Sequence, residues 1–209
     1  MNVVIPLRDR SILQDWELRY CIKSIRKFTN AEVIFIVSKK RDVEFPGNSG
    51  KIVWIDYQDK YPAKNPTRHE NVRLKVIAAG EAIRKPFLLM NDDMFFLKKT
   101  DITTIPLYYW KTCKEFAKNK GGRYRQMLER INGLNFELHL PIIVDPNLFK
   151  AVTKSGELYR SVYCNASSLP KKERKDVKIQ RLSKVDDIIS TSETALKNEI
   201  KDLIMQACD

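Results

Sequence analysis

Apolar runs that are typical of buried strands alternate with an amphipathic helix at the start of the chain, and this alternation restricts the fold more than any other feature. Residues 2–7 and 32–38 are short and almost entirely apolar. Between them, residues 14–28 carry apolar side chains along one helix face, namely Leu18, Cys21, Ile22 and Ile25. The order strand, helix, strand predicts a parallel sheet with a right-handed crossover.

The same pattern continues with two more strands and one more helix. Residues 51–56 and 87–90 are apolar runs of strand length. The second of these runs follows a helix that we expect from about His69 to Ile83, ended by Pro86. We therefore predict an α/β fold in which helices flank a mostly parallel sheet, within a single domain.

The second half of the chain gives weaker signals. A strand is expected over residues 102–109, and residues 115–130 are charged enough to form a mobile or helical insertion. Asp145 followed by Pro146 predicts a helix start, because Asp caps free backbone amides and Pro is tolerated in the first turn. A capping-box pattern at residues 190–193, followed by apolar positions with helical spacing, predicts a terminal helix.

Length and composition favour one globular domain. With 209 residues, of which 43% are hydrophobic, the chain can bury one sizeable core. No apolar stretch approaches the ~20 residues that span a bilayer, and the N-terminus lacks a signal-peptide pattern. Four cysteines without a CxxC pair indicate neither a zinc site nor a disulfide framework. We expect a cytoplasmic protein, free or peripheral to a membrane.

A formal net charge of +12 is the most unusual bulk property. Residues 170–184 supply much of it, with seven basic and two acidic side chains. A basic surface concentrates anionic partners, but charge alone fits nucleic acid, nucleotide-sugars and membrane headgroups. Single-stranded nucleic acid would favour aromatic side chains among the basic ones, and this segment has none. Nucleic acid is therefore the less favoured partner.

Asn91, Asp92 and Asp93 stand between two apolar runs, directly after a predicted buried strand. In an open α/β sheet, ligands bind beyond the carboxyl ends of the strands. Adjacent carboxylates at such a place suit Mg²⁺ or Mn²⁺, which prefer oxygen ligands. The same residue types also form ordinary turns, so a metal site and a structural turn both remain open.

Other side chains that are able to carry chemistry are few. Only His69 and His139 are histidines, and His139 lies in an apolar run, where a buried structural role competes with general-base catalysis. Arg160 could bind phosphate oxygens through its planar fork or form a surface ion pair. The aromatic residues 108–110 are interpreted as core packing in preference to a sugar platform. P-loop, GxSxG and HExxH motifs do not occur in the sequence.

Several segments follow one another in an informative order. Residues 15–25 read DWELRYCIKSI, residues 33–37 read VIFIV, and residues 87–95 read FLLMNDDMF. The shorter segments are Asn65-Pro66-Thr67 before Glu70, His139-Leu140-Pro141, and Arg160-Ser161. In this order they resemble the Stealth family, which includes bacterial capsular-polysaccharide phosphotransferases and the animal N-acetylglucosamine-1-phosphotransferase catalytic subunit. The resemblance covers residues 8–97 well and residues 136–165 more loosely.

This resemblance implies a nucleotide-sugar transferase fold of the GT-A or Rossmann-like kind. Residues 1–97 would be its nucleotide-binding-like half, and residues 98–209 its acceptor-side half. The implied reaction transfers a hexose 1-phosphate from a nucleotide-sugar donor to a hydroxyl group of a glycan acceptor, assisted by Mg²⁺ or Mn²⁺. A glycosyltransferase that moves only the sugar, a relative that binds donor without turnover, and a basic nucleic-acid-binding protein are the alternatives.

The resemblance also implies a role for each candidate residue. Asp92 and Asp93 would hold the metal and take part in catalysis, and Arg160 would stabilise charge on the transferred phosphoryl group. His139 would accept the proton of the attacking hydroxyl group, and Glu70 would line the donor site or assist the acceptor. The predicted substrate-binding residues are Arg8, Arg19 and Asn91.

Overall fold

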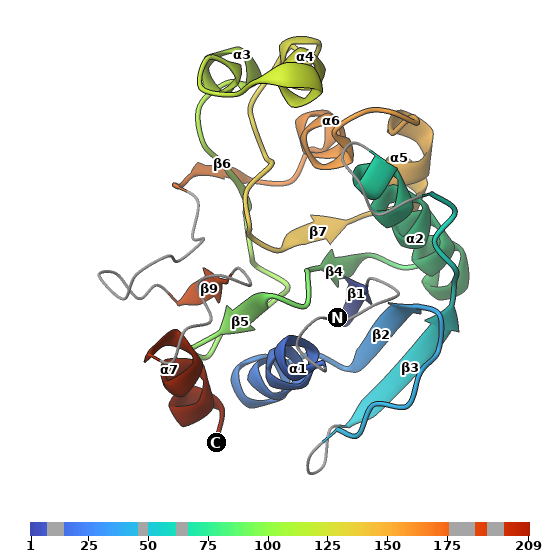
Figure 1. Ribbon diagram of the computed structural model, residues 1–209, viewed down its shortest axis with the longest axis vertical. Helices are drawn as coiled ribbons and strands as arrows, with labels where there is room; N and C mark the ends of the chain where they lie inside the picture. Colours follow the sequence, from blue (N-terminus) through green and yellow to red (C-terminus); the bar gives the residue numbers. More distant parts are fainter. Residues whose placement is uncertain (8–14, 46–49, 62–66, 176–186, 192–198) are drawn as a thin grey trace.

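The computed structural model describes all but five segments of the chain, and the described residues are 1–7, 15–45, 50–61, 67–175, 187–191 and 199–209. A five-stranded sheet in the order β3-β2-β1-β4-β7 lies at the centre (Figure 1). Its strands are β1 (Asn2–Pro6), β2 (Val33–Ser38), β3 (Lys51–Asp56), β4 (Phe87–Leu89) and β7 (Ile142–Val144). The first four are parallel, and β7 runs antiparallel to β4. The predicted α/β fold with a mostly parallel sheet is confirmed.

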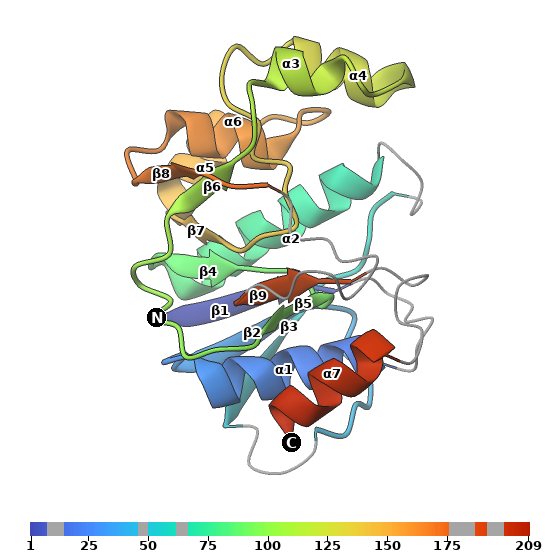
Figure 2. The same ribbon diagram turned by 90° about the vertical axis from the view of Figure 1, so that its left-hand side faces the viewer.

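Helices cover both faces of this sheet (Figure 2). On one face lie α1 (Trp16–Phe28) and α7 (Glu199–Cys208). On the other lie α2 (Thr67–Ile83), α5 (Pro146–Val152) and α6 (Tyr159–Ala166). α1 leads outward from β1 to β2, whereas α2 leads back from β3 past β1 to β4. Right-handed crossovers that run in opposite directions along a sheet place their helices on opposite faces.

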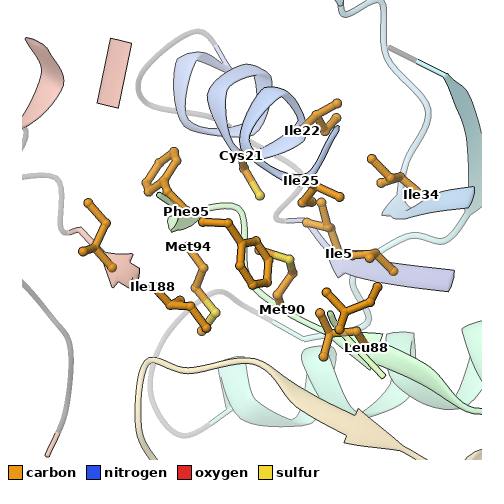
Figure 3. Close-up of a cluster of buried hydrophobic side chains, with 14 of the residues drawn as sticks. Ile5, Cys21, Ile22, Ile25, Ile34, Leu88, Met90, Met94, Phe95 and Ile188 are labelled. Atoms are coloured by element: carbon orange, nitrogen blue, oxygen red, sulfur yellow. The ribbon is translucent and has the colours of Figure 1, made fainter. Parts of the chain in front are cut away.

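The larger buried core lies between the sheet and α1. The stripe predicted from the sequence is the face that α1 buries, since Leu18, Cys21, Ile22 and Ile25 are at most 2% exposed. Figure 3 shows Cys21, Ile22 and Ile25 in one cluster with Ile5 and Leu88 of the sheet. Full burial of an aliphatic side chain contributes about 1.5–3 kcal/mol, so this stripe orients α1 on the sheet. A second core lies between the other face and α2, α5 and α6.

Two short strand pairs and a helical pair extend this centre. β5 (Met94–Phe96) pairs antiparallel with β9 (Ile188–Ser190), and β6 (Leu107–Tyr109) pairs in parallel with β8 (Lys171–Glu173). After β6, α3 (Cys113–Ala117) and α4 (Gly122–Glu129) pack around a small apolar cluster of their own. Because β7 pairs with β4, the second half of the chain completes the sheet of the first half.

Two element predictions need correction. Within residues 102–109 only Leu107–Tyr109 form a strand, because the Asp101 side chain accepts a hydrogen bond from the Thr103 amide and closes a turn before it. Ser190 belongs to β9, where it pairs with Met94, and so it does not cap the terminal helix. The residues from 192 to 198, which include the rest of that capping-box pattern, lie outside the described residues.

Other predictions of local structure are confirmed. Asp145 caps α5 by accepting hydrogen bonds from the amides of Asn147 and Leu148, with Pro146 in the first turn. The charged segment 115–130 is largely helical, as part of α3 and α4. The basic segment 170–184 begins as strand β8, and its part from residue 176 onward lies outside the described residues. In the described ranges, no helix is long and apolar enough to cross a membrane.

Candidate functional site

The strand order places the carboxyl ends of β1 and β4 side by side. From β1 the chain runs outward on one side to β2 and β3, and then returns to place β4 on the other side, parallel to β1. In open α/β sheets, ligands bind beyond the carboxyl ends of the strands, so this edge is the candidate site. Asn91, Asp92 and Asp93 directly follow β4 at this edge. Arg8, the predicted substrate-binding residue that follows β1 in the sequence, lies outside the described residues.

The three polar residues form a turn between β4 and β5. The Met94 amide donates a hydrogen bond to the Asn91 carbonyl oxygen at 3.3 Å, which closes the turn. The Asp93 carbonyl oxygen accepts a hydrogen bond from the Thr191 amide at 3.0 Å, which ties the turn to the end of β9. The two interpretations left open by the sequence are thus compatible, because a fixed turn also fixes where its carboxylates lie.

One carboxylate oxygen in this turn lacks a donor. Asp93 Oδ1 is buried and has no hydrogen-bond partner among the described residues. A buried carboxylate oxygen without a donor or cation destabilises the fold by about 1–3 kcal/mol or more. An oxygen of this kind is able to accept a hydrogen bond or to bind a cation.

The first turns of α1 add further negative charge near this turn. Glu17 Oε1 accepts a hydrogen bond from Thr191 Oγ1 at 3.5 Å, so α1 and the Asp93 turn share one neighbour. Cys21 is fully buried, and its Sγ lies 3.7 Å from the Asn91 carbonyl oxygen. Burial raises the pKa of the Cys21 thiol well above its ordinary value, and the charges of Asp92 and Asp93 raise it further. The thiol therefore stays protonated.

The carboxylates of this turn are of the type that binds a hard divalent cation whose coordination shell is completed by oxygens of water and substrate. No group of three or more His, Cys, Asp or Glu side chains that could hold a metal occurs in the described part of the chain. Mg²⁺ needs only one or two carboxylates when water and substrate phosphate complete its shell. Asp92 and Asp93 are the residues of this turn that could form such a pair, and within the described ranges Asp93 Oδ1 accepts no hydrogen bond.

Arg19 lies two residues beyond Glu17 on α1, whose first turn begins at this edge. Its Nε is buried and has no hydrogen-bond partner among the described residues. The guanidinium group thus retains a donor that nothing in the described part of the chain uses. Its predicted role in substrate binding stays a prediction.

The strand beside β4 brings His139 to the same edge. β7 pairs antiparallel with β4, with Leu89 opposite Ile142. The chain just before Ile142 therefore lies on the side of the sheet where the chain leaves Leu89. His139 belongs to the first of these segments, and Asn91 and Asp92 belong to the second. His139 is partly buried. The pairing brings together two segments that lie far apart in the sequence.

Arg160 is fixed next to this strand from α6. It is 5% exposed, and its Nη2 donates a hydrogen bond to the Leu140 carbonyl oxygen. Its Nε is buried without a partner among the described residues. Glu137 Oε1 accepts hydrogen bonds from the Ser161 amide at 2.9 Å and from Ser161 Oγ at 3.0 Å, which caps the start of α6. The helix that carries Arg160 is thus tied to the segment that carries His139.

His69 is a functional candidate that sequence reasoning did not select. It lies in the first turn of α2 and stacks on the Tyr124 ring of α4, with ring centroids 6.2 Å apart. Burial lowers the pKa of His69, Glu137 opposes this effect, and Arg68 and Arg160 reinforce it. A neutral imidazole near Arg160 is therefore available at neutral pH. The only sequence signal was the rarity of histidine, since nothing local links His69 to Glu137 or Arg160.

Glu70 lies at the same end of α2, but its carboxylate is already engaged. It is 9% exposed, and its Oε1 forms an ion pair with Arg73 Nη2 at 2.6 Å. Its Oε2 accepts a hydrogen bond from the Gly156 amide at 3.4 Å. Hydrogen bonds from Arg73 hold the pKa of Glu70 below its ordinary value. This carboxylate is thus bound within the protein, unlike Asp93 Oδ1.

Replacing Glu70 by Gln is expected to lower the free energy of unfolding at pH 7 by about 2 kcal/mol, a typical value for hydrogen bonds to a charged group. The folded-state pKa is lowered, so this stabilisation is present above the unfolded-state pKa, near 4.5, and is lost as the pH falls through the folded-state pKa. Urea unfolding of both proteins along a pH series should show the difference shrinking in acid.

The matched control is Glu81→Gln on the same helix, where the pair with Lys150 has side chains 61% and 60% exposed. An exposed pair contributes about 0–1 kcal/mol, so this variant should unfold nearly like the parent. A loss of stability in Glu70→Gln that stays constant from neutral to acid pH would contradict the ion-pair explanation.

Lys75 is a second residue that the sequence did not reveal. This lysine is 2% exposed, and its Nζ lies 2.6 Å from Asp59 Oδ1. The same Nζ donates a hydrogen bond to the Leu7 carbonyl oxygen at 2.5 Å. Lys75 therefore ties α2 to the carboxyl end of β1 and to the connection after β3, both of which border the candidate site.

Comparison of the chain with models of known protein families gives no match, and comparison with curated proteins gives none either.

Proposed function

We propose that this protein is a metal-assisted transferase that moves a hexose 1-phosphate from a nucleotide-sugar to a hydroxyl group of a glycan. The observation that carries the proposal is the pair of adjacent carboxylates beyond the carboxyl end of β4, one of which has a buried oxygen that receives no hydrogen bond from the described part of the chain. A nucleotide diphosphate with its cation is a ligand that such a pair accommodates.

The arrangement of the segments that resemble the Stealth family supports this choice. Four of these segments border one edge of the mostly parallel sheet. They are the α1 segment, the Asn91-Asp92-Asp93 turn, His139-Leu140-Pro141 and Arg160-Ser161. A GT-A or Rossmann-like donor site is the finer fold assignment that we propose for residues 1–97, with the acceptor on the side of residues 98–209.

Asp92 and Asp93 would hold Mg²⁺ or Mn²⁺, and a bound divalent cation neutralises charge on a diphosphate and so eases departure of the nucleotide. Asn91 would orient the donor within the same turn, and Arg8 and Arg19 would contact its phosphates. Arg160 would place its guanidinium against the phosphoryl oxygens, because a planar fork matches their geometry. Its Nε, which bonds to no atom of the described residues, supports that role.

A histidine imidazole would accept the proton in the proposed reaction. His139 would accept the proton of the attacking hydroxyl group, since its segment enters the sheet beside the carboxylate turn. Glu70 would act indirectly, because its ion pair with Arg73 holds the start of α2 in place. His69 on that same turn is the alternative proton acceptor.

Product analysis tests the proposal against its nearest rival. The protein is incubated with nucleotide-sugars, Mn²⁺ and glycan acceptors, after a thermal-shift screen has selected the donor that stabilises the fold only with metal present. Transfer of the sugar phosphate releases a nucleoside monophosphate, whereas transfer of the sugar alone releases a nucleoside diphosphate. Release of the diphosphate would overturn the phosphotransferase assignment, and stabilisation by no nucleotide-sugar would overturn the donor site.

A further inference from the structure

Most of the excess positive charge of the chain lies at one end of the molecule. We define the basic lobe as residues 107–134 and 170–175, which include β6, α3, α4 and β8. In Figure 2, α3 and α4 lie at the top, and the paired strands β6 and β8 lie below them in the upper half of the molecule. These residues contain eleven Lys or Arg and three Glu, a formal excess of eight out of the net charge of +12. The lobe is thus far more basic than the rest of the protein.

Local acidic groups do not neutralise this charge. The Glu115 carboxylate is engaged at the start of α3, where its Oε2 accepts hydrogen bonds from the Thr112 amide at 2.9 Å and from Thr112 Oγ1 at 2.7 Å. Glu129 pairs with Arg125 at 2.7 Å on the surface of α4. The remaining glutamate, Glu173, stands within β8 between basic neighbours. The lobe therefore presents a strongly positive surface.

Aromatic rings hold several of these cations in place. The guanidinium of Arg174 lies 4.9 Å from the centre of the Tyr108 ring. Two ammonium groups, those of Lys175 and Lys111, lie 5.3 Å and 5.6 Å from the centre of the Trp110 ring. Lys111 adopts a left-handed backbone conformation, with φ of 63°. A ring orders a cation without cancelling its charge, so these groups remain attractive to anions.

These rings come from a segment that the sequence did not connect with the basic run. Residues 170–184 contain no aromatic side chain, but parallel pairing of β6 with β8 places Tyr108 beside Lys172. Both Tyr108 and Trp110 pack against the main core with part of their surface exposed. Tyr108 and Trp110 therefore pack against the core, as predicted, and also order the basic side chains above their rings.

We propose that the basic lobe binds an acidic polysaccharide. Cations of the protein lie over the Tyr108 and Trp110 rings, and single-stranded nucleic acid needs open ring faces for base stacking. A chain of sugars that carry carboxylate or phosphate groups needs only ordered cations along its length.

Binding is tested with fluorescently labelled oligogalacturonate, without nucleotide-sugar or divalent metal, so an inactive transferase would leave the result intact. Fluorescence anisotropy should show binding that weakens steeply with added NaCl, while neutral dextran of the same length does not bind. The double variant Lys111→Glu and Lys175→Glu should bind about tenfold more weakly, as expected when two ionic contacts are lost.

The matched control is the double variant Lys51→Glu and Lys85→Glu, which changes net charge equally at exposed positions at the start of β3 and before β4. Equal losses in both double variants, or equal binding of dextran, would overturn the proposal. Tighter binding of an oligodeoxythymidylate with the same number of charges would overturn it in favour of nucleic acid. Should the first double variant not fold by circular dichroism, Lys172→Glu on the exposed strand β8 replaces it.

Discussion

Replacing Asp93 by Asn should lower turnover by about 10³-fold while making the protein without metal more stable. Turnover falls because a neutral amide no longer balances the cation and its diphosphate, and loss of one well-placed electrostatic group costs about 10²–10³-fold in rate. Stability rises because Asp93 Oδ1 is a buried carboxylate oxygen without a donor among the described residues. Relief of about 1 kcal/mol would raise Tm by about 2–4 °C in a chain of this size.

Two measurements check this expectation, a thermal melt in the presence of a chelator and a nucleotide-release assay with Mn²⁺. Asp92→Asn should lose turnover to a similar extent. The matched control is Asp187→Asn, which removes an exposed ion pair with Lys98 and should change neither quantity by much. Full turnover in Asp92→Asn or Asp93→Asn would refute the metal assignment. A lower Tm for Asp93→Asn without metal would show that Oδ1 is satisfied.

Replacing Arg160 by Lys should lower kcat by about 10²-fold, with a smaller change in the donor KM. The guanidinium uses Nη2 to hold the Leu140 carbonyl oxygen and keeps Nε without a partner among the described residues. A lysine ammonium could bond either to the Leu140 carbonyl oxygen or to a phosphoryl oxygen, but not to both in the same geometry, because it lacks the planar fork. The charge is therefore retained, and the geometry toward a phosphoryl group is lost.

Steady-state kinetics and urea unfolding of Arg160→Lys separate a role in chemistry from a role in folding. Arg125→Lys is the control, since Arg125 pairs with Glu129 on the surface and lies outside the candidate site. A variant with normal kcat but reduced stability would mean that Arg160 only fastens α6 to the segment before β7. A variant with reduced kcat and unchanged unfolding would support contact with the transferred group.

The sequence predicted the elements that build the sheet because burial leaves a local pattern. The stripe from Leu18 to Ile25 and the apolar run before Asn91 each report how one segment meets the core. The predictions failed where a side chain bonds to the backbone nearby. At Asp101, the side chain accepts a hydrogen bond from the Thr103 amide, and the resulting turn shortens the strand expected over residues 102–109. Ser190 shows the other limit, since its pairing with Met94 depends on a strand far away in the chain.

The candidate site divides in the same way. The sequence alone proposed the carboxylate turn from its residue types and its position after a strand, and the roles of His139 and Arg160 were implied by the resemblance to the Stealth family. Only the tertiary structure decided that β7 enters beside β4, that His69 lies near Glu137 and Arg160, and that Lys75 holds the end of β1. The physical reason is that local patterns record the burial of each segment, whereas contacts between distant residues exist only after the chain has closed around the sheet.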